Sequence, residues 1–156
     1  MASFMDLSKN YSFYSIPLAY LLAMLPGAYA KGLGSKHYDI ANPRGFQEQI
    51  KKDDGIDKVT KNRILRGEAA SANATETISF FVAGVVAANY GGVPVGTTNL
   101  LCATYLASRT LYNVVYVWLQ DNRKLAPLRS VMFNIGVISW MTMFIKAGNR
   151  LYEASS

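Results

Sequence analysis

Four apolar stretches dominate the pattern of hydrophobic and polar positions along the chain. Phe13–Ala30 and Ser130–Ile145 contain no charged residue, and Leu100–Leu119 contains only Arg109. The remaining stretch, Arg66–Asn89, is polar in its first turns and apolar in its second half. A helix needs about 20 mostly apolar residues to cross a bilayer. The pattern therefore predicts an all-α protein in which four transmembrane helices form a bundle. The spans are expected at about residues 13–33, 66–89, 98–120 and 128–150.

One domain covering residues 1–156 accommodates these spans, with a polar loop at about residues 34–65. A soluble protein with four core helices is the alternative, but its helices would need polar faces that these stretches lack. Pro26 breaks the hydrogen bonding of the first helix, and we expect neighbouring helices to satisfy the freed backbone group. Ala28–Ala30 resembles a signal-peptidase site. A charge-free run of this length can itself span a membrane, so we expect the segment to be retained.

Composition excludes several classes of function. The chain is 51% hydrophobic and only 17% charged, which excludes intrinsic disorder. Cys102 is the only cysteine and His37 the only histidine, so neither an internal disulfide nor a metal site is expected. The net charge is +6, but the basic residues are not clustered among stacking aromatic residues. A nucleic-acid partner is therefore not expected.

The basic residues are distributed unequally between the two expected sides of the membrane. Nine Lys or Arg lie between Lys31 and Arg66, and the link between the third and fourth spans adds Arg123, Lys124 and Arg129. The other side carries three, which are Lys9, Lys146 and Arg150. Cytosolic segments of membrane proteins carry the excess of basic residues. The basic side is therefore predicted to be cytosolic, and both termini are predicted to be lumenal or exterior.

Polar residues recur at helical spacing within the second and third spans. Asn73 and Glu76 lie on one stripe of the second span with Arg66, and Arg109, Tyr112 and Tyr116 form a similar stripe in the third. Glu76 and Arg109 are the only charges deep in their spans. The simplest solution is an ion pair between them, within one protomer or across subunits, and its main role would be to fix helix register.

The polar residues could also approach one cavity that faces the cytosol. A cavity with this chemistry would suit a small anion with several hydrogen-bonding groups. The alternative, a plain solvated basic face, explains Arg123 and Lys124 equally well. The residues that could line the cavity are Arg66, Asn73, Tyr112, Tyr116, Arg123, Lys124 and Arg129.

Three motifs, in this order along the chain, resemble those of the MAPEG family (membrane-associated proteins in eicosanoid and glutathione metabolism). Arg66–Glu76 follows the pattern R-x-x-x-A-x-x-N-x-x-E of its second helix. Ser108–Tyr116 is similar to its third helix, and Leu125–Ser130 to the link before its fourth. Ala41–Pro43 also resembles its loop after the first helix. The resemblance implies a homotrimer of four-helix membrane bundles in the endoplasmic reticulum, with glutathione bound between subunits near the cytosolic side.

The resemblance also implies roles for individual residues. Arg129 and Ser130 match a catalytic arginine–serine pair, and Lys124 falls at the position of a second thiolate-stabilising residue. Arg129 is the first choice for stabilising the thiolate, because an adjacent cation lowers a thiol pKa. The residues expected to bind glutathione are Arg66, Asn73, Glu76, Arg109, Tyr112, Tyr116 and Arg123.

Several positions depart from the family pattern, so three functions stay open. Relatives often have arginine where Ala69 and Ala72 stand, and histidine where Ser71 stands; Tyr112, Phe133 and Gly34 are further departures. The leading hypothesis is a glutathione transferase that conjugates the thiolate to a small hydrophobic electrophile, with a peroxidase side activity. The second is a glutathione-independent isomerase, dehydratase or cyclase of a lipophilic metabolite, with Tyr112, Tyr116 and Glu76 as acid–base groups. The third is a non-catalytic membrane subunit.

Overall fold

The computed structural model describes residues 8–155, and the secondary structure in this range is entirely helical. The expected all-α class is therefore confirmed, while residues 1–7 and 156 of the expected domain lie outside the described range. The helices are α1 (Ser15–Leu33), α2 (Phe46–Lys52), α3 (Lys58–Tyr90), α4 (Val95–Val117) and α5 (Ala126–Ala154). Short 3₁₀ turns lie at Ser12–Tyr14, Ser35–His37, Pro43–Gly45, Leu119–Asp121 and Arg123–Leu125.

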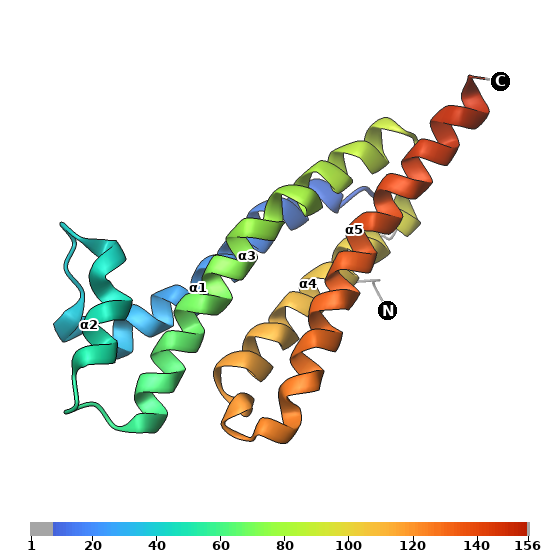
Figure 1. Cartoon of the computed structure of the whole chain (residues 1–156). Coiled ribbons are helices and arrows are strands. Elements are labelled where there is room, and N and C mark those ends of the chain that lie inside the picture. The colour runs from blue at the N-terminus through green and yellow to red at the C-terminus, as the bar shows by residue number, and fades with distance from the viewer. Residues whose placement is uncertain (1–7, 156) are drawn as a thin grey trace, which may run out of the picture.

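The four long helices lie alongside one another, and α2 projects at one end (Figure 1). The helix α1 packs on α3, α4 packs on α5, and α3 also contacts both α4 and α5. A shared core of Phe81, Val85, Tyr105 and Met143 joins α3, α4 and α5. The rings of Phe81 and Tyr105 stack with 3.8 Å between centroids. This packing fixes the faces that α3, α4 and α5 turn toward one another.

Two helical segments are long and apolar enough to cross a membrane. These are Ser12–Leu33, which contains α1, and Arg123–Ala154, which contains α5. The middle helices α3 and α4 are long enough but not apolar enough by the same measure, because polar side chains interrupt their apolar runs. The membrane crossing of α3 and α4 therefore stays a prediction from the sequence.

The helix α3 begins earlier than the expected span at residue 66. The Asp57 carboxylate caps it by accepting hydrogen bonds from the backbone N–H groups of Val59 and Thr60, each 3.0 Å long. An Asp at this position satisfies N–H groups that have no partner within the helix. As a result Arg66 lies well inside a helix, and its position is fixed by the turns on both sides.

Neighbouring helices satisfy the backbone groups that Pro26 frees in α1, as the sequence predicts. Pro26 has no N–H to offer the carbonyl of Leu22, and Asn113 Nδ2 of α4 donates to that carbonyl at 3.0 Å. The Ser71 hydroxyl of α3 donates to the next carbonyl, Ala23, at 2.8 Å. These two contacts tie α1 to α3 and α4 at the level of the proline.

The segments 34–57 and 118–125 lie at the same end of the bundle (Figure 1). We call this the basic end. Phe46 and Ile50 of α2 are buried there against Ala30 and Ile64, so the first segment folds onto α1 and α3. At the opposite end lie the α3–α4 turn and the C-terminal part of α5 (Figure 1). The grouping of the two basic segments at one end agrees with the charge distribution in the sequence.

Candidate functional site

Two adjoining cavities at the basic end share Tyr116 and Arg129 as lining residues, and together we call them the polar cavity. The cavity nearer the bundle centre has a volume of about 430 Å³, and the outer one about 380 Å³. The inner part is lined by Ala69, Asn73, Tyr112, Tyr116, Arg129, Ser130, Phe133 and Asn134. The outer part is lined by Asn62, Leu65, Arg66, Tyr116, Gln120, Arg123 and Arg129.

Arg129 lies in the first turn of α5 and faces both parts of the polar cavity. Its guanidinium carbon lies 4.7 Å from the centroid of the Tyr116 ring, a cation–π distance. Among the described residues, no carboxylate forms an ion pair with Arg129. The cavity therefore contains a positive charge that no described carboxylate neutralises.

Arg66 is held at the rim of the polar cavity by an acidic residue of the α4–α5 link. The Asp121 carboxylate accepts hydrogen bonds from Arg66 and from Arg63, the latter through Nε at 3.2 Å and Nη2 at 2.8 Å. The hydrogen bonds from Arg66 and then Arg63 hold the pKa of the Asp121 carboxyl below its usual value. Asp121 thus joins α3 to the link, and it fixes where Arg66 lies.

Two buried polar atoms of residues that line the outer part of the polar cavity have no hydrogen-bond partner. They are Nε of Arg66 and Oε1 of Gln120. Buried polar groups are almost always hydrogen-bonded in folded proteins. Arg66 and Gln120 are thus the lining residues of this part whose hydrogen bonding the described chain leaves incomplete.

Arg109 lies buried on α4 and contacts only uncharged partners. Its Nη2 donates to Asn73 Oδ1 at 3.1 Å and to Thr77 Oγ1 at 3.2 Å. Its guanidinium carbon also lies 5.0 Å from the Tyr112 ring centroid and 5.5 Å from that of Phe133. Hydrogen bonds and contacts with aromatic rings thus hold this buried cation next to the polar cavity. Arg109 itself does not line the cavity.

The predicted ion pair between Glu76 and Arg109 is wrong within one protomer. Glu76 is exposed on α3, and Arg109 is 5% exposed and turned toward Asn73 and Thr77. Adjacent residues of a helix point about 100° apart, so the face that carries Thr77 cannot also carry Glu76. The alternative, a pair formed across subunits, stays a prediction.

Asn73 offers a donor to the polar cavity because Arg109 fixes the orientation of its amide. A guanidinium can only donate hydrogen bonds, so the amide oxygen must face Arg109. The amide NH₂ then points away from Arg109, and Asn73 lines the inner part of the cavity. Arg109 therefore acts on the cavity through Asn73.

The remaining predicted site residues differ in where they lie. Tyr112, Tyr116 and Ser130 line the inner part of the polar cavity, and Arg123 lines the outer part. Lys124 is exposed and lines neither part. The structure thus brings seven of the ten predicted residues together and leaves out Glu76, Arg109 and Lys124.

Sequence reasoning did not place Gln120 and Asn134 in the site. Gln120 follows Tyr116 by four residues, and Asn134 follows Ser130 by four. Residues four apart on a helix lie on the same face, so extending the polar stripe of α5 by one turn would have found Asn134. Gln120 lies beyond the end of α4, in the 3₁₀ turn Leu119–Asp121, so the rule for residues of one helix does not place it. Asn62 and Leu65 lie in the stretch that was expected to be loop, so no helical stripe was drawn through them.

The cavity favours an anionic ligand on charge alone. Arg66, Arg123 and Arg129 line it, none of its lining residues is acidic, and only Arg66 among the three forms an ion pair with a described carboxylate, that of Asp121. Basic side chains gathered in a cleft raise the local concentration of anions. A ligand with carboxylates and hydrogen-bonding amides would match both the charge and the polar side chains of the lining.

Comparison with known proteins gives one match. The family model described as "MAPEG family" matches residues 11–149, which is nearly the whole chain. No curated protein and no solved structure matches. The chain belongs to the MAPEG family of membrane-associated proteins.

Proposed function

We propose that the protein is an integral-membrane glutathione transferase, an enzyme that joins the glutathione thiolate to a small hydrophobic electrophile. The observation that carries the proposal is Arg129, a cation without an ion-pair partner among the described residues, in a cavity that Arg123 also lines and that has no acidic lining residue. Membership of the family supports glutathione as the substrate of this cavity.

The membrane arrangement is part of the proposal. All four long helices cross the bilayer, with the basic end cytosolic and both termini lumenal, and the endoplasmic reticulum is the proposed location. Exposed Glu76 on α3 supports a homotrimer, because an acidic side chain facing lipid hydrocarbon costs a few kcal/mol or more. A second and third copy would cover this face of α3.

The outer part of the polar cavity is suited to bind the carboxylates of glutathione. Arg123 supplies a positive charge, and Arg66, which shares its charge with Asp121, lines the same part. The Gln120 amide also lines this part and can bond to a polar group of the same substrate. Guanidinium groups bind carboxylates with two parallel hydrogen bonds, which fixes orientation as well as position.

Arg129 is suited to hold the thiol in its ionised form. A free thiol has a pKa near 8.5, and a neighbouring cation lowers it, so the thiolate becomes more abundant at neutral pH. The Ser130 hydroxyl lines the same part of the cavity and can donate a hydrogen bond to the sulfur. The thiolate sulfur then forms a bond to the electrophilic carbon, and the displaced electron pair leaves with the leaving group. With a hydroperoxide as the electrophile, the same thiolate would attack the terminal oxygen, the O–O bond would break, and the alkoxide would leave and take up a proton to give the alcohol. A second glutathione would then reduce the resulting glutathione sulfenic acid, with formation of glutathione disulfide and water, which completes the peroxidase side activity.

Turnover by an Arg129→Ala variant tests the proposal. We expect kcat/KM for glutathione conjugation of an aryl halide to fall about tenfold to a hundredfold, because the thiolate loses its cation. The pH–rate profile should also move to higher pH. Arg44→Ala is the control, because Arg44 is an exposed arginine of the segment 34–57. Undiminished turnover by Arg129→Ala would remove Arg129 from the mechanism, and loss in Lys124→Ala alone would transfer its role to Lys124.

A second candidate function rests on Tyr112 and Tyr116. Both line the inner part of the polar cavity, with 5.6 Å between their ring centroids. Phenol hydroxyls can serve as acid–base groups for an isomerase, dehydratase or cyclase. Glu76, the third acid–base group considered for this function, is exposed and does not line the cavity. Turnover of a lipophilic substrate without any thiol would favour this function, and absence of all turnover would favour the non-catalytic subunit.

A further inference from the structure

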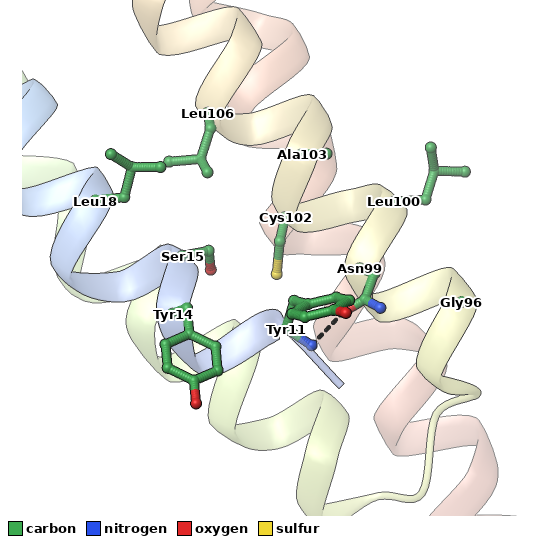
Figure 2. Close-up of a pocket in the computed structure, with 10 residues that line it drawn as sticks. All are labelled: Tyr11, Tyr14, Ser15, Leu18, Gly96, Asn99, Leu100, Cys102, Ala103 and Leu106. Atoms are coloured by element: carbon green, nitrogen blue, oxygen red, sulfur yellow. Dashed lines mark hydrogen bonds between the residues drawn. The ribbon is translucent and has the colours of Figure 1, made fainter. Parts of the chain in front are cut away.

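Figure 2 shows an apolar groove between α1 and α4. Its lining includes Gly96, next to the α3–α4 turn, so the groove lies toward the end of the molecule opposite the basic end. Leu18 and Leu106 extend toward each other from the two helices at one end of the groove, and Tyr11 lies at its other end beside Asn99 (Figure 2). Its volume is about 580 Å³, within the range of about 300–1,000 Å³ that is typical of ligand sites. The groove does not contribute to the proposed glutathione chemistry.

The depth of the groove matches one leaflet of a bilayer. Its lining begins at Gly96, at the start of α4, and reaches Leu106. The ten steps between these two residues rise about 15 Å along a helix. The hydrocarbon core of a bilayer is about 30 Å thick, so one leaflet is about 15 Å deep. A groove that opens where α4 begins would therefore end near the bilayer midplane.

The shape and lining of the groove suit a flexible hydrocarbon chain. Its volume of about 580 Å³ extends over about 15 Å along α4. Leu18, Leu100 and Leu106 give it an apolar lining over that length.

The mouth of the groove carries groups that suit a lipid headgroup. Asn99 Oδ1 accepts a hydrogen bond from the Tyr11 N–H at 3.0 Å, and Asn99 Nδ2 donates to the Lys9 carbonyl at 2.8 Å. These bonds hold the segment 9–11 against the first turns of α4, so the backbone of Lys9 lies next to the mouth. Tyr11 and Tyr14 also line this part, and tyrosine is enriched at the level of lipid headgroups.

We propose that the α1–α4 groove binds one phospholipid of the leaflet at this end of the bundle. One acyl chain lies between Leu18 and Leu106, and the phosphate lies beside Lys9. The Lys9 side chain is exposed, and no described carboxylate forms an ion pair with it. This inference requires α1 and α4 to cross the membrane, but it does not depend on glutathione.

Photolabelling of the full-length protein in phospholipid vesicles tests the proposal. The probe is a phosphatidylcholine with a photoreactive diazirine on one acyl chain, and mass spectrometry locates its adducts. We expect the adducts to concentrate in two peptides, one containing Leu18 and the other containing Ala103 and Leu106. An even distribution of adducts over the exposed faces of α1, α4 and α5 would overturn the proposal.

Two alanines of α4 provide a matched pair of variants. Ala103 lines the groove. Ala107, one turn further along α4, is also exposed but does not line it. We expect Ala103→Phe to reduce labelling of the groove at least fivefold and Ala107→Phe to leave it unchanged. Equal labelling in both variants would contradict an acyl chain in the groove. If Ala103→Phe does not fold, the positions of the adducts on the unmodified protein still test the proposal.

The place of the phosphate is tested by a second pair of variants. We expect Lys9→Gln to reduce groove labelling about fivefold, the upper end of the effect of losing one exposed ion pair, here between Lys9 and the phosphate. Lys146→Gln is the control, because Lys146 is an exposed lysine of α5. Unchanged labelling in Lys9→Gln would show that the phosphate does not lie beside Lys9 and would overturn that part of the proposal.

Discussion

Arg109 and its two neutral partners form the buried polar centre of the molecule. A buried cation without a carboxylate depends on its hydrogen bonds, and Thr77 Oγ1 supplies one of the two that the structure gives it. Removing that oxygen leaves the charge less well satisfied, which costs more than the loss of a neutral hydrogen bond.

Thr77→Val should therefore lower the free energy of unfolding by about 1.5–3 kcal/mol, the usual contribution of a hydrogen bond to a charged group. Thermal unfolding in detergent measures the change. Thr110→Val is the control, because Thr110 is exposed and its hydroxyl bonds only to the Leu106 carbonyl of its own helix. Similar values for the two variants would show that Thr77 does not stabilise the Arg109 charge.

Asp121 gives the protein a pH dependence of predictable sign. Its pKa is lowered in the folded protein, first by the hydrogen bond from Arg66 and then by that from Arg63. The stabilisation is therefore fully present above the unfolded pKa of about 3.9, and it is lost as pH falls through the lowered pKa.

We expect wild type to be more stable than Asp121→Asn at neutral pH, with a difference that disappears as the pH falls below the lowered pKa. Unfolding midpoints measured across this acid range test the sign. The Asp54→Asn variant is the control, because Asp54 is fully exposed and its only described ion-pair contact, with Lys61, is 3.9 Å long. A difference that grows as the pH falls would contradict the assignment to Asp121.

The close approach of α1 and α3 depends on Gly67. A Cβ atom added there would lie 2.7 Å from the Pro26 carbonyl oxygen and 3.0 Å from the Ala30 Cβ. Backbone atoms cannot move aside as a flexible side chain can, so the two helices would have to separate. Small residues at helix contacts are the usual means of such close packing in membranes.

Gly67→Ala should destabilise the protein by about 1–3 kcal/mol through this overpacking, despite the better helix propensity of alanine. Gly148→Ala, in α5, should stabilise it by up to about 1 kcal/mol, since a Cβ there meets nothing within 4 Å. Unfolding midpoints of the two variants should therefore shift in opposite directions. A stabilising Gly67→Ala would show that α1 and α3 do not pack as described.

The positions of the long helices could be read from the sequence, but their polar extensions could not. An apolar run marks the part of a helix that is suited to lipid. The helix α3 begins several turns before its apolar run does. That first part is held by the Asp57 cap and by the contacts of Ile64 with Phe46 and Ile50. A tertiary contact of this kind leaves no periodic signal in the sequence.

The candidate site could be predicted in its composition but not in its geometry. Helical spacing placed Tyr112 and Tyr116 on one face correctly. It could not show that Arg109 bonds to Asn73 rather than to Glu76. Helical spacing gives the relative directions of side chains on α3, but it does not say which of them faces α4. Asp121, which positions Arg66, lies in a link whose fold depends on contacts far away in the sequence.

The proposed topology of the whole molecule places its two ends on opposite sides of the membrane. In a Cys102→Ser background, Lys52→Cys and Arg150→Cys introduce single exposed thiols at the two ends. In sealed vesicles with the cytosolic face outward, a membrane-impermeant thiol reagent should label Lys52→Cys directly and Arg150→Cys only after detergent. The reverse pattern, or labelling of both without detergent, would rule out this orientation.

Ionisation of glutathione bound to the purified protein tests the proposed site most directly. Ultraviolet absorbance of the thiolate, followed across pH, gives the pKa of the bound thiol. The proposal predicts a value at least one unit below the free-thiol value of about 8.5, and a return toward that value in Arg129→Ala. A bound thiol with the pKa of free glutathione, or no binding at all, would contradict the proposed role of the polar cavity.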